Sequence, residues 1–288
     1  MTTPAELAPL ARRIWRRLEP LHAITYFAPE SHAALEAVGM KGFWMGYFAA
    51  RSAAMGAASP NLIIATFYNF HPSIVHRAVP DCWAITTPGA VLKARTEGMV
   101  NALDRVALDV TTLEPLARTM AEATAEQLEG RPLFAAHAEL PWPDAPGAMQ
   151  AWWAATLIRE HRGDGHVAAL VDADVAPCEA LVLQSTYTAI PRQTLQLTRN
   201  WSDDEWQVAI ESLAARGWLD SEGGPTEKGH AGLAAVERRT DELAARSVLT
   251  IGTDAASALA EAALPVAQAV MAAGAVPTIT PMFADDDI

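Results

Sequence analysis

Lysine and cysteine are scarce in this 288-residue chain. It has three lysines against eighteen arginines, and only two cysteines, Cys82 and Cys178. Two cysteines cannot build the set of disulfides that stabilises small secreted domains. The first residues also lack the basic and then apolar pattern of a signal peptide. These absences predict a reduced, cytoplasmic protein.

Charge is also in short supply, and most of it is acidic. Charged residues make up 19 % of the chain and the formal net charge is −13. Phosphate backbones repel such a chain, so nucleic-acid binding needs a local basic patch. The 51 % of hydrophobic residues excludes a disordered chain. The longest charge-free apolar run, residues 262–283, holds three prolines, which favours a surface helix and tail over a membrane span.

Standard catalytic signatures are missing. The chain contains no G-x-S-x-G elbow, no G-x4-G-K phosphate loop and no H-E-x-x-H zinc motif. What it does contain is helical periodicity, in residues 5–18, 41–55, 90–106, 113–128 and 149–159. Gly130 stands where a helix would end. We therefore expect a mainly α fold with an N-terminal half (1–130), a Pro-rich connection (131–147), a C-terminal half (148–246) and an Ala-rich helix with an acidic tail (247–288).

The two halves share a pattern at an offset of 119 residues. Gly46 then falls on Gly165, Tyr68 on Tyr187, and Pro72 on Pro191. The pattern predicts two copies of one helical unit. Because clefts form between domains, a ligand site between the two halves follows from it.

Residues 177–246 give the clearest local signal. Two short helical stretches (177–189 and 191–197) precede a capping box formed by Ser202 and Glu205, and a Gly-Gly turn at 223–224 precedes a long helix after Thr226. This order predicts a winged helix-turn-helix with a small β wing. We expect the long helix after Thr226 and other terminal helices to make a homodimer.

The run "WSDDEWQVAIESLAARGWLD", followed by "TEKG" and "VERRTDELA", resembles the MarR-like winged-helix regulators. The whole chain is similar to a family of actinobacterial winged helix-turn-helix proteins, in which such a unit follows a helical region with a "GYFAARSAAMG"-type stretch, here residues 46–56. The resemblance implies a DNA-binding scaffold. The third helix of the unit, however, carries four acids against Arg216 alone, and a groove-reading helix needs cations, so we predict that DNA binding has been lost.

Two groups of residues are candidates for a ligand site. In the first, His161-Arg-Gly-Asp164-Gly-His166, we expect the glycines to form a loop between helices and Asp164 to orient or charge a histidine. The alternative is a plain helix–helix turn. The second group gathers aromatic and histidine side chains of the first half near one arginine, and the alternative there is core packing; its members are His22, Tyr26, Trp44, Tyr47, Arg51, Tyr68 and His71.

These observations predict a small-molecule-binding protein with a pocket for a flat aromatic or tetrapyrrole-like ligand between the halves. Haem held by His22, His71 or His166 is one version of that ligand. The alternatives are a ligand-responsive MarR-like transcription regulator and an enzyme that uses the 161–166 segment.

Overall fold

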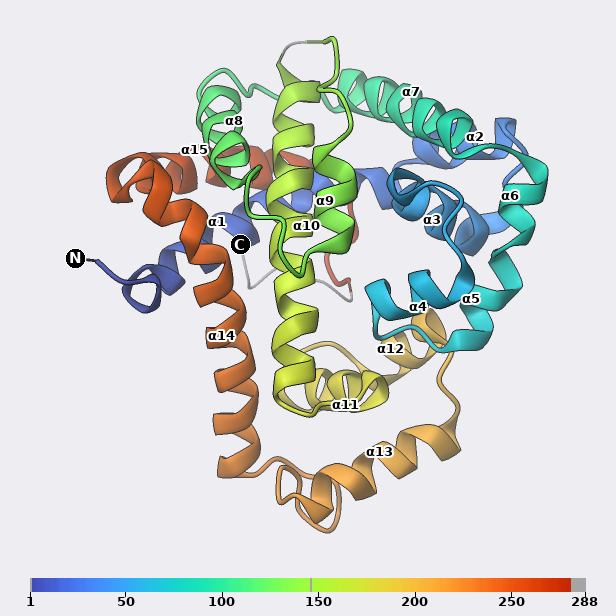
Figure 1. Cartoon of the computed structure of the whole chain (residues 1–288), viewed down its shortest axis with the longest axis vertical. Coiled ribbons are helices and arrows are strands. Elements are labelled where there is room, and N and C mark those ends of the chain that lie inside the picture. Colours follow the sequence, from blue (N-terminus) through green and yellow to red (C-terminus); the bar gives the residue numbers. More distant parts are fainter. Residues whose placement is uncertain (1, 146, 281–288) are drawn as a thin grey trace.

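The protein is described by a computed structural model that covers residues 2–145 and 147–280, and Figure 1 shows its arrangement. It is mainly helical, as expected. The helices are α1 (Pro4–Phe27), α2 (Pro29–Ala37), α3 (Gly42–Ser52), the 3-10 helix η1 (Ala53–Met55), α4 (Pro60–Phe67), α5 (Pro72–Ala78), α6 (Asp81–Ile85), α7 (Pro88–Val106), α8 (Leu113–Thr124), α9 (Pro132–Ala138), α10 (Ala148–Asp172), α11 (Pro177–Tyr187), α12 (Arg192–Arg199), α13 (Asp203–Ala215), α14 (Glu227–Ile251) and α15 (Thr253–Ala272).

Many of these helices begin at a proline. Pro4, Pro60, Pro72 and Pro177 all stand in the first turn, where a missing N–H costs nothing because it has no intrahelical partner. Capping boxes close the N-termini of α1 and α13. The local sequence therefore sets most helix starts.

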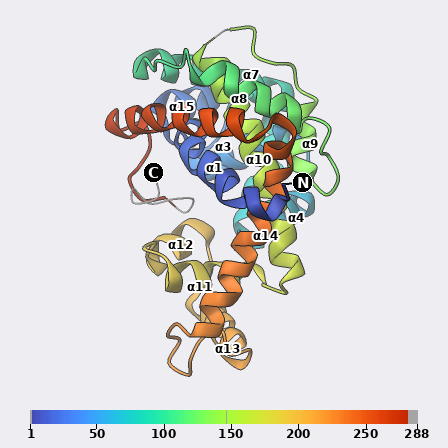
Figure 2. The ribbon, with the colours of Figure 1, turned by 90° about the vertical axis from the view of Figure 1, so that its left-hand side faces the viewer.

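A central bundle carries the largest core. In it α1 packs against α10, α14 and α15, and α8 packs against α10, α14 and α15. Large side chains such as Ile14 and Trp152 are buried between these helices. The first and last helices of the chain thus lie side by side with the middle one, and Figure 2 shows them together in the upper part of the molecule.

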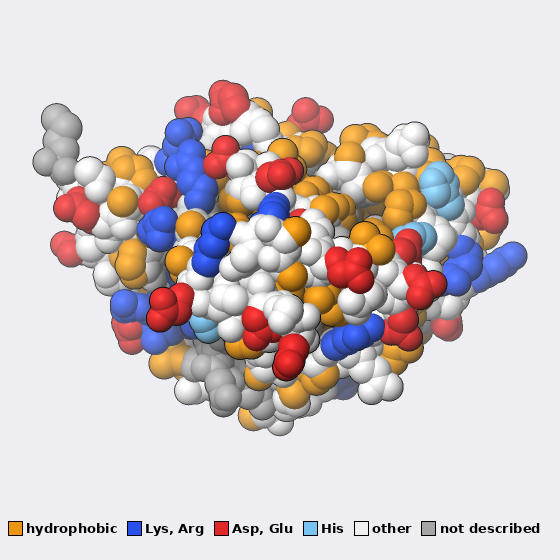
Figure 3. Space-filling view, turned by 90° about the horizontal axis from the view of Figure 1, so that it is seen from below, with side chains coloured by type: hydrophobic (Ala, Val, Ile, Leu, Met, Phe, Trp, Pro, Cys, Tyr) orange, Lys and Arg blue, Asp and Glu red, His pale blue; other side chains and the backbone are white. Residues whose placement is uncertain are grey.

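The N-terminal unit, formed by α2 to α7, has a separate core beside the bundle, where Phe48, Ile63 and Val75 are buried. The C-terminal unit, α11 to α13, has a third core around Trp206 and Leu213. The long helices α10 and α14, each of 25 residues, run from the bundle down to this unit (Figures 1 and 2). Seen from below, this end of the molecule shows acidic and basic side chains interspersed (Figure 3).

The predicted β wing is wrong. Among the described residues no segment forms a strand, and the turn between α13 and α14 has a single isolated bridge between Leu219 and Pro225. Asp220 accounts for this, because its carboxylate accepts the N–H groups of Glu222 and Gly224 and closes a tight turn in place of a hairpin.

The predicted loop at His161–His166 is also wrong, because all six residues lie inside α10. Gly165 serves close packing there. A Cβ at this position would stand 2.7 Å from Nη1 of Arg131, whose guanidinium donates to the carbonyl of His161. The Pro-rich connection (131–147) differs from expectation as well: it contains α9, with Leu133 and Phe134 buried.

Two predictions about partners concern the last helices. Within one chain, α14 already packs against α1, α8 and α10. The helix that suggested a homodimer therefore has partners in its own chain, and the homodimer stays a prediction. In the part of the chain that the structure describes, α15 is the one helix long and apolar enough to cross a membrane by length and composition, and here Leu259 and Val266 are buried against the bundle. The expected acidic tail, 285–287, lies outside the described residues.

Candidate functional site

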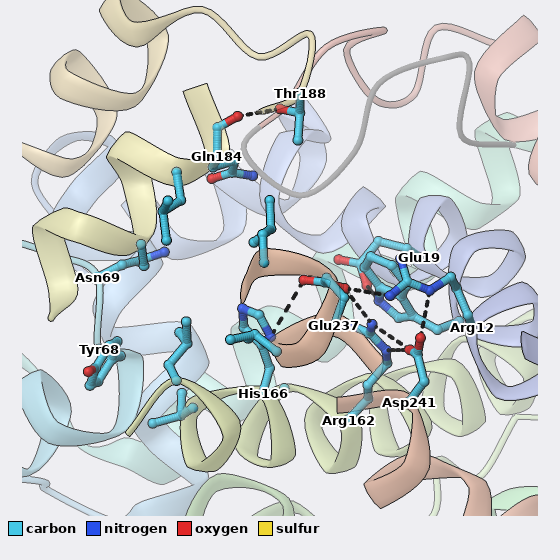
Figure 4. Close-up of a pocket in the computed structure, with 18 of the residues that line it drawn as sticks. Arg12, Glu19, Tyr68, Asn69, Arg162, His166, Gln184, Thr188, Glu237 and Asp241 are labelled. Atoms are coloured by element: carbon cyan, nitrogen blue, oxygen red, sulfur yellow. Dashed lines mark hydrogen bonds and ion pairs between the residues drawn. The ribbon is translucent and has the colours of Figure 1, made fainter. Parts of the chain in front are cut away.

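A cavity of about 1020 Å³ lies where the bundle, the N-terminal unit and the C-terminal unit meet. Its wall comes from α1, α3, α4, α10, α11 and α14, together with the turn after α4 and the end of α12. Figure 4 shows Tyr68 and Asn69 on one side of it and His166 and Glu237 on another. The volume is at the upper end of the range for small-molecule sites.

Glu160 organises one side of this cavity. Its carboxylate is 1 % exposed and accepts from Nε and Nη2 of Arg51 at 3.2 and 3.1 Å, and from Nη1 of Arg159 at 2.6 Å. Arg159 also lies 3.5 Å from the buried Glu19. Burial alone would raise the pKa of Glu160, but the two guanidinium groups lower it well below its ordinary value. The carboxylate is therefore ionised and fixes both arginines.

A second ion-pair cluster joins α1, α10 and α14 one helical turn farther along α10. Asp241 accepts from Nε of Arg12 at 2.6 Å and from Nη2 of Arg162 at 2.8 Å, and Glu237 pairs with the same two arginines (Figure 4). His166 stands beside the cluster, with Nδ1 at 3.0 Å from Oγ1 of Thr240 and 3.8 Å from Glu237. Burial, together with the charge of Arg162, lowers the pKa of His166, so the ring is neutral near pH 7. Among the described residues Nε2 has no hydrogen-bond partner.

Asp164 does not orient a histidine, contrary to the expectation. Its Oδ2 accepts the backbone N–H of Phe134 at 2.8 Å, and its side chain forms part of the cavity wall. Burial raises the pKa of Asp164 to about 6. The carboxylate thus holds the start of α9 against α10, and the pKa of neither His161 nor His166 is raised by it.

Five of the ten predicted site residues lie on the cavity wall: Asp164, His166, Tyr47, Arg51 and Tyr68. Tyr47 accepts from Nη1 of Arg51 at 3.2 Å, and its ring lies among the aromatic side chains of the N-terminal unit. Tyr68 donates to the carbonyl of Val175 at 2.6 Å and so ties the two units together. Whether these residues bind a ligand remains a prediction.

The other five lie away from this cavity. His161 is buried edge-on against Phe134, and burial lowers its pKa to about 2. His22 is buried between Thr156 and Tyr26, which use both of its ring nitrogens, and Tyr26 faces a separate small cavity of about 80 Å³.

Trp44 and His71, the last two of these five, support the structure around the cavity. Trp44 belongs to the aromatic cluster that surrounds Tyr47. His71 caps α5 and lies 2.9 Å from Glu205 of α13. The backbone N–H of His71 also donates to the carbonyl of Arg199. These contacts join the N-terminal unit to the helix-turn-helix unit.

Several wall residues were missed by the sequence reasoning, although a signal for them exists. Arg159, Arg162 and Leu170 are spaced three or four residues apart together with the predicted His166, which places all four on one face of a helix. The assumed loop at 161–166 hid this stripe. Arg199 has no such signal, because one residue at the end of a short helix forms no pattern.

The described residues hold no group of three or more metal-ligating side chains placed to bind a metal ion. Of the three histidines considered for haem, His22 and His71 have both ring nitrogens engaged. Of these three, only His166 lies on the cavity wall, and its Nε2 has no hydrogen-bond partner among the described residues. Haem binding through His166 therefore remains a prediction.

The surface that a helix-turn-helix uses for DNA is acidic here. The exposed side chains of α13 include Asp203, Asp204 and Glu211, with Val208 65 % exposed among them. Arg216, just after the helix, is turned inward, where it donates to the carbonyl of Asp174 and lies 3.5 Å from Glu179. No cation on α13 is left to contact a phosphate.

Comparison with known proteins agrees with this topology. A model of a helix-turn-helix family matches residues 11–277, which is nearly the whole chain. No curated protein and no solved structure matches it. Because the match includes the bundle and both units, the chain belongs to this helix-turn-helix family.

Proposed function

We propose that the protein binds a small aromatic molecule in the cavity between its two units and that its helix-turn-helix unit serves as a scaffold. The observation that carries this is the cavity itself: at about 1020 Å³ it is large enough for a flat, multi-ring ligand. Aromatic rings line it from the bundle (Trp15), the N-terminal unit (Phe67 and Tyr68) and the C-terminal unit (Tyr187). Part of the cavity wall is apolar, and part carries arginines held in place by ion pairs. This combination is typical of a ligand site.

The test has two parts. Native mass spectrometry and absorbance spectra of the purified protein show whether a molecule is carried along. The neutral fluorescent dye N-phenyl-1-naphthylamine then serves as a probe. We expect one dye per chain in the wild type and none in Ala180→Phe, which places a ring on the cavity wall. His76→Phe, at an exposed position on α5, is the control and should bind normally. A dye that binds equally well to both variants would refute the proposal.

The second part of the proposal is that duplex DNA is not a partner. The acidic outward face of α13 supports it, because a groove-reading helix needs cations or neutral donors there. A gel-shift titration against the upstream region of its own gene, at ~150 mM salt, measures this. A sequence-specific complex tighter than roughly micromolar would overturn it.

A ligand-responsive regulator is the second candidate, since the family match gives the scaffold of one. The contacts between the units also favour it. Trp201 donates to the carbonyl of Asn69 at 2.9 Å, and Asn200 donates to Ser73 at 2.8 Å, so movement at the cavity wall reaches α13 directly. A DNA complex that forms or dissociates only when the dye is added would select this candidate.

The enzyme reading has less support. It requires a histidine activated by Asp164, and that carboxylate is bonded to a backbone N–H instead. Among the described residues of the wall, a histidine approaches a carboxylate only at His166 and Glu237, and that distance is 3.8 Å.

A further inference from the structure

Arg199, the last residue of α12, is a buried cation on the cavity wall. It is 7 % exposed, and its guanidinium lies over the ring of Phe70 at 4.3 Å. Nη1 donates to the carbonyl of Thr198 at 3.4 Å, while Nε has no hydrogen-bond partner. No carboxylate of the described residues lies within ion-pair distance of it.

This isolation sets Arg199 apart from the other arginines of the wall. Arg51 and Arg159 share Glu160, and Arg159 also approaches Glu19. Among the described residues Arg199 thus differs from both, because its guanidinium forms no ion pair. Burial lowers the pKa of Arg199 to about 10, and the charges of Arg51 and Arg159 add to the effect. Keeping an uncompensated cation in such a place is costly for the free protein.

We infer that the ligand of this cavity is an aromatic monoanion whose carboxylate or sulfonate lies against Arg199. The inference rests on the proposed function and adds the charge class of the ligand. A guanidinium binds the oxygens of a carboxylate or sulfonate through its N–H groups, and among the described residues the guanidinium of Arg199 makes one hydrogen bond, from Nη1.

The surroundings of Arg199 fit the rest of such a molecule. Phe67 and Phe70 lie next to each other, with ring centroids 6.4 Å apart, and carry Arg51 and Arg199 on their faces. Farther along the wall, α10 and α11 supply apolar side chains such as Leu170. A single uncompensated positive charge matches one negative charge, so a singly charged group fits better than a dianion.

Two dyes with one ring system test this. 1-Anilinonaphthalene-8-sulfonate is the anion, and N-phenyl-1-naphthylamine is the same skeleton without the sulfonate. We expect Arg199→Gln to weaken binding of the sulfonate dye by about tenfold to a hundredfold and to leave the neutral dye within about twofold. The matched control is Arg192→Gln, on the same helix but exposed and outside the cavity wall, which should change neither dye.

Thermal unfolding separates this role from a structural one. Because Arg199→Gln removes an uncompensated buried charge, its unfolding temperature should equal or exceed that of the wild type. A variant that unfolds earlier and loses both dyes equally would show that Arg199 only supports the fold, and would overturn the inference.

The failures of the two proposals are distinguishable. If the neutral dye binds, is lost in Ala180→Phe, and the sulfonate dye is insensitive to Arg199→Gln, the cavity is a ligand site and only the anion inference fails. If neither dye binds the wild type, or Ala180→Phe changes neither, the proposed function fails and this inference fails with it.

Discussion

Replacing Asp164 by asparagine should make the protein more stable at neutral pH, although it removes a buried charge that accepts a hydrogen bond. The folded carboxyl has its pKa raised from the ordinary 3.8 to about 6, chiefly by burial. In the folded state it therefore keeps its proton over a range in which the unfolded chain has lost it. The unfolding free energy falls with rising pH across that range, from about pH 4 to about pH 6, and stays low above it.

The magnitude follows from the size of the shift. A pKa raised from 3.8 to about 6 corresponds to about 3 kcal/mol of unfolding free energy. Asparagine has the same shape, and its carbonyl oxygen accepts the N–H of Phe134 in the same way, so the variant keeps the contact without the titration. We expect Asp164→Asn to match the wild type near pH 4 and to exceed it by up to about 3 kcal/mol near pH 8.

Urea denaturation followed by far-ultraviolet circular dichroism measures both free energies at each pH. Comparing variant with wild type cancels the contributions of the buried histidines, which titrate in both proteins. A difference that does not change between about pH 4 and about pH 8, or a variant that is less stable at the higher pH, would refute the reasoning.

Three further predictions concern the cavity and the fold. Glu160→Gln leaves Arg51 and Arg159 short of a buried counter-ion, so urea denaturation should show a loss of about 3–5 kcal/mol, whereas the exposed pair partner Glu122→Gln should cost no more than about 0.5 kcal/mol. His166→Ala should weaken binding of N-phenyl-1-naphthylamine by about tenfold to a hundredfold with an unchanged helical signal; wild-type affinity would remove this histidine from the site. Residues 46–72 and 165–191 should superpose along one helix-turn-helix path, and unrelated crossing angles would show that the repeat is coincidence.

Much of the fold follows from local sequence signals. The capping box at Ser202 and the turn chemistry around α11 to α13 are local interactions, and the family match confirms the helix-turn-helix they indicate. The wing was mispredicted because Gly223-Gly224 suits several turn types, and the choice among them falls to the Asp220 side chain. The placement of α1 beside α14 and α15 has no local signal at all, because it depends on contacts more than 200 residues apart.

The candidate site divides in a similar way. Aromatic side chains and Arg51 were found because they cluster in the sequence. His161, Asp164 and His166 were grouped because two glycines among them suggested a turn. In α10 the glycine at 165 instead gives room to the Arg131 guanidinium, a requirement that only the packed structure reveals. Residues 161 and 166 consequently point in different directions, one into the core and one into the cavity.

The excess of arginine over lysine has a physical use at this site. Arg162 lies over the ring of Trp15 at 3.8 Å, and Arg51 and Arg199 lie over phenylalanine rings at 4.3 Å. A flat, weakly hydrated guanidinium stacks on an aromatic face and still directs its N–H groups sideways, which the compact, strongly hydrated ammonium of lysine does not do. Stacked in this way, Arg51 donates two hydrogen bonds to Glu160. Arg199 is stacked in the same way, but its Nε has no acceptor. Although the chain is acidic overall, the unpaired guanidinium of Arg199 is a local positive charge on the wall of a large cavity. We therefore expect it to attract an anionic group of the ligand.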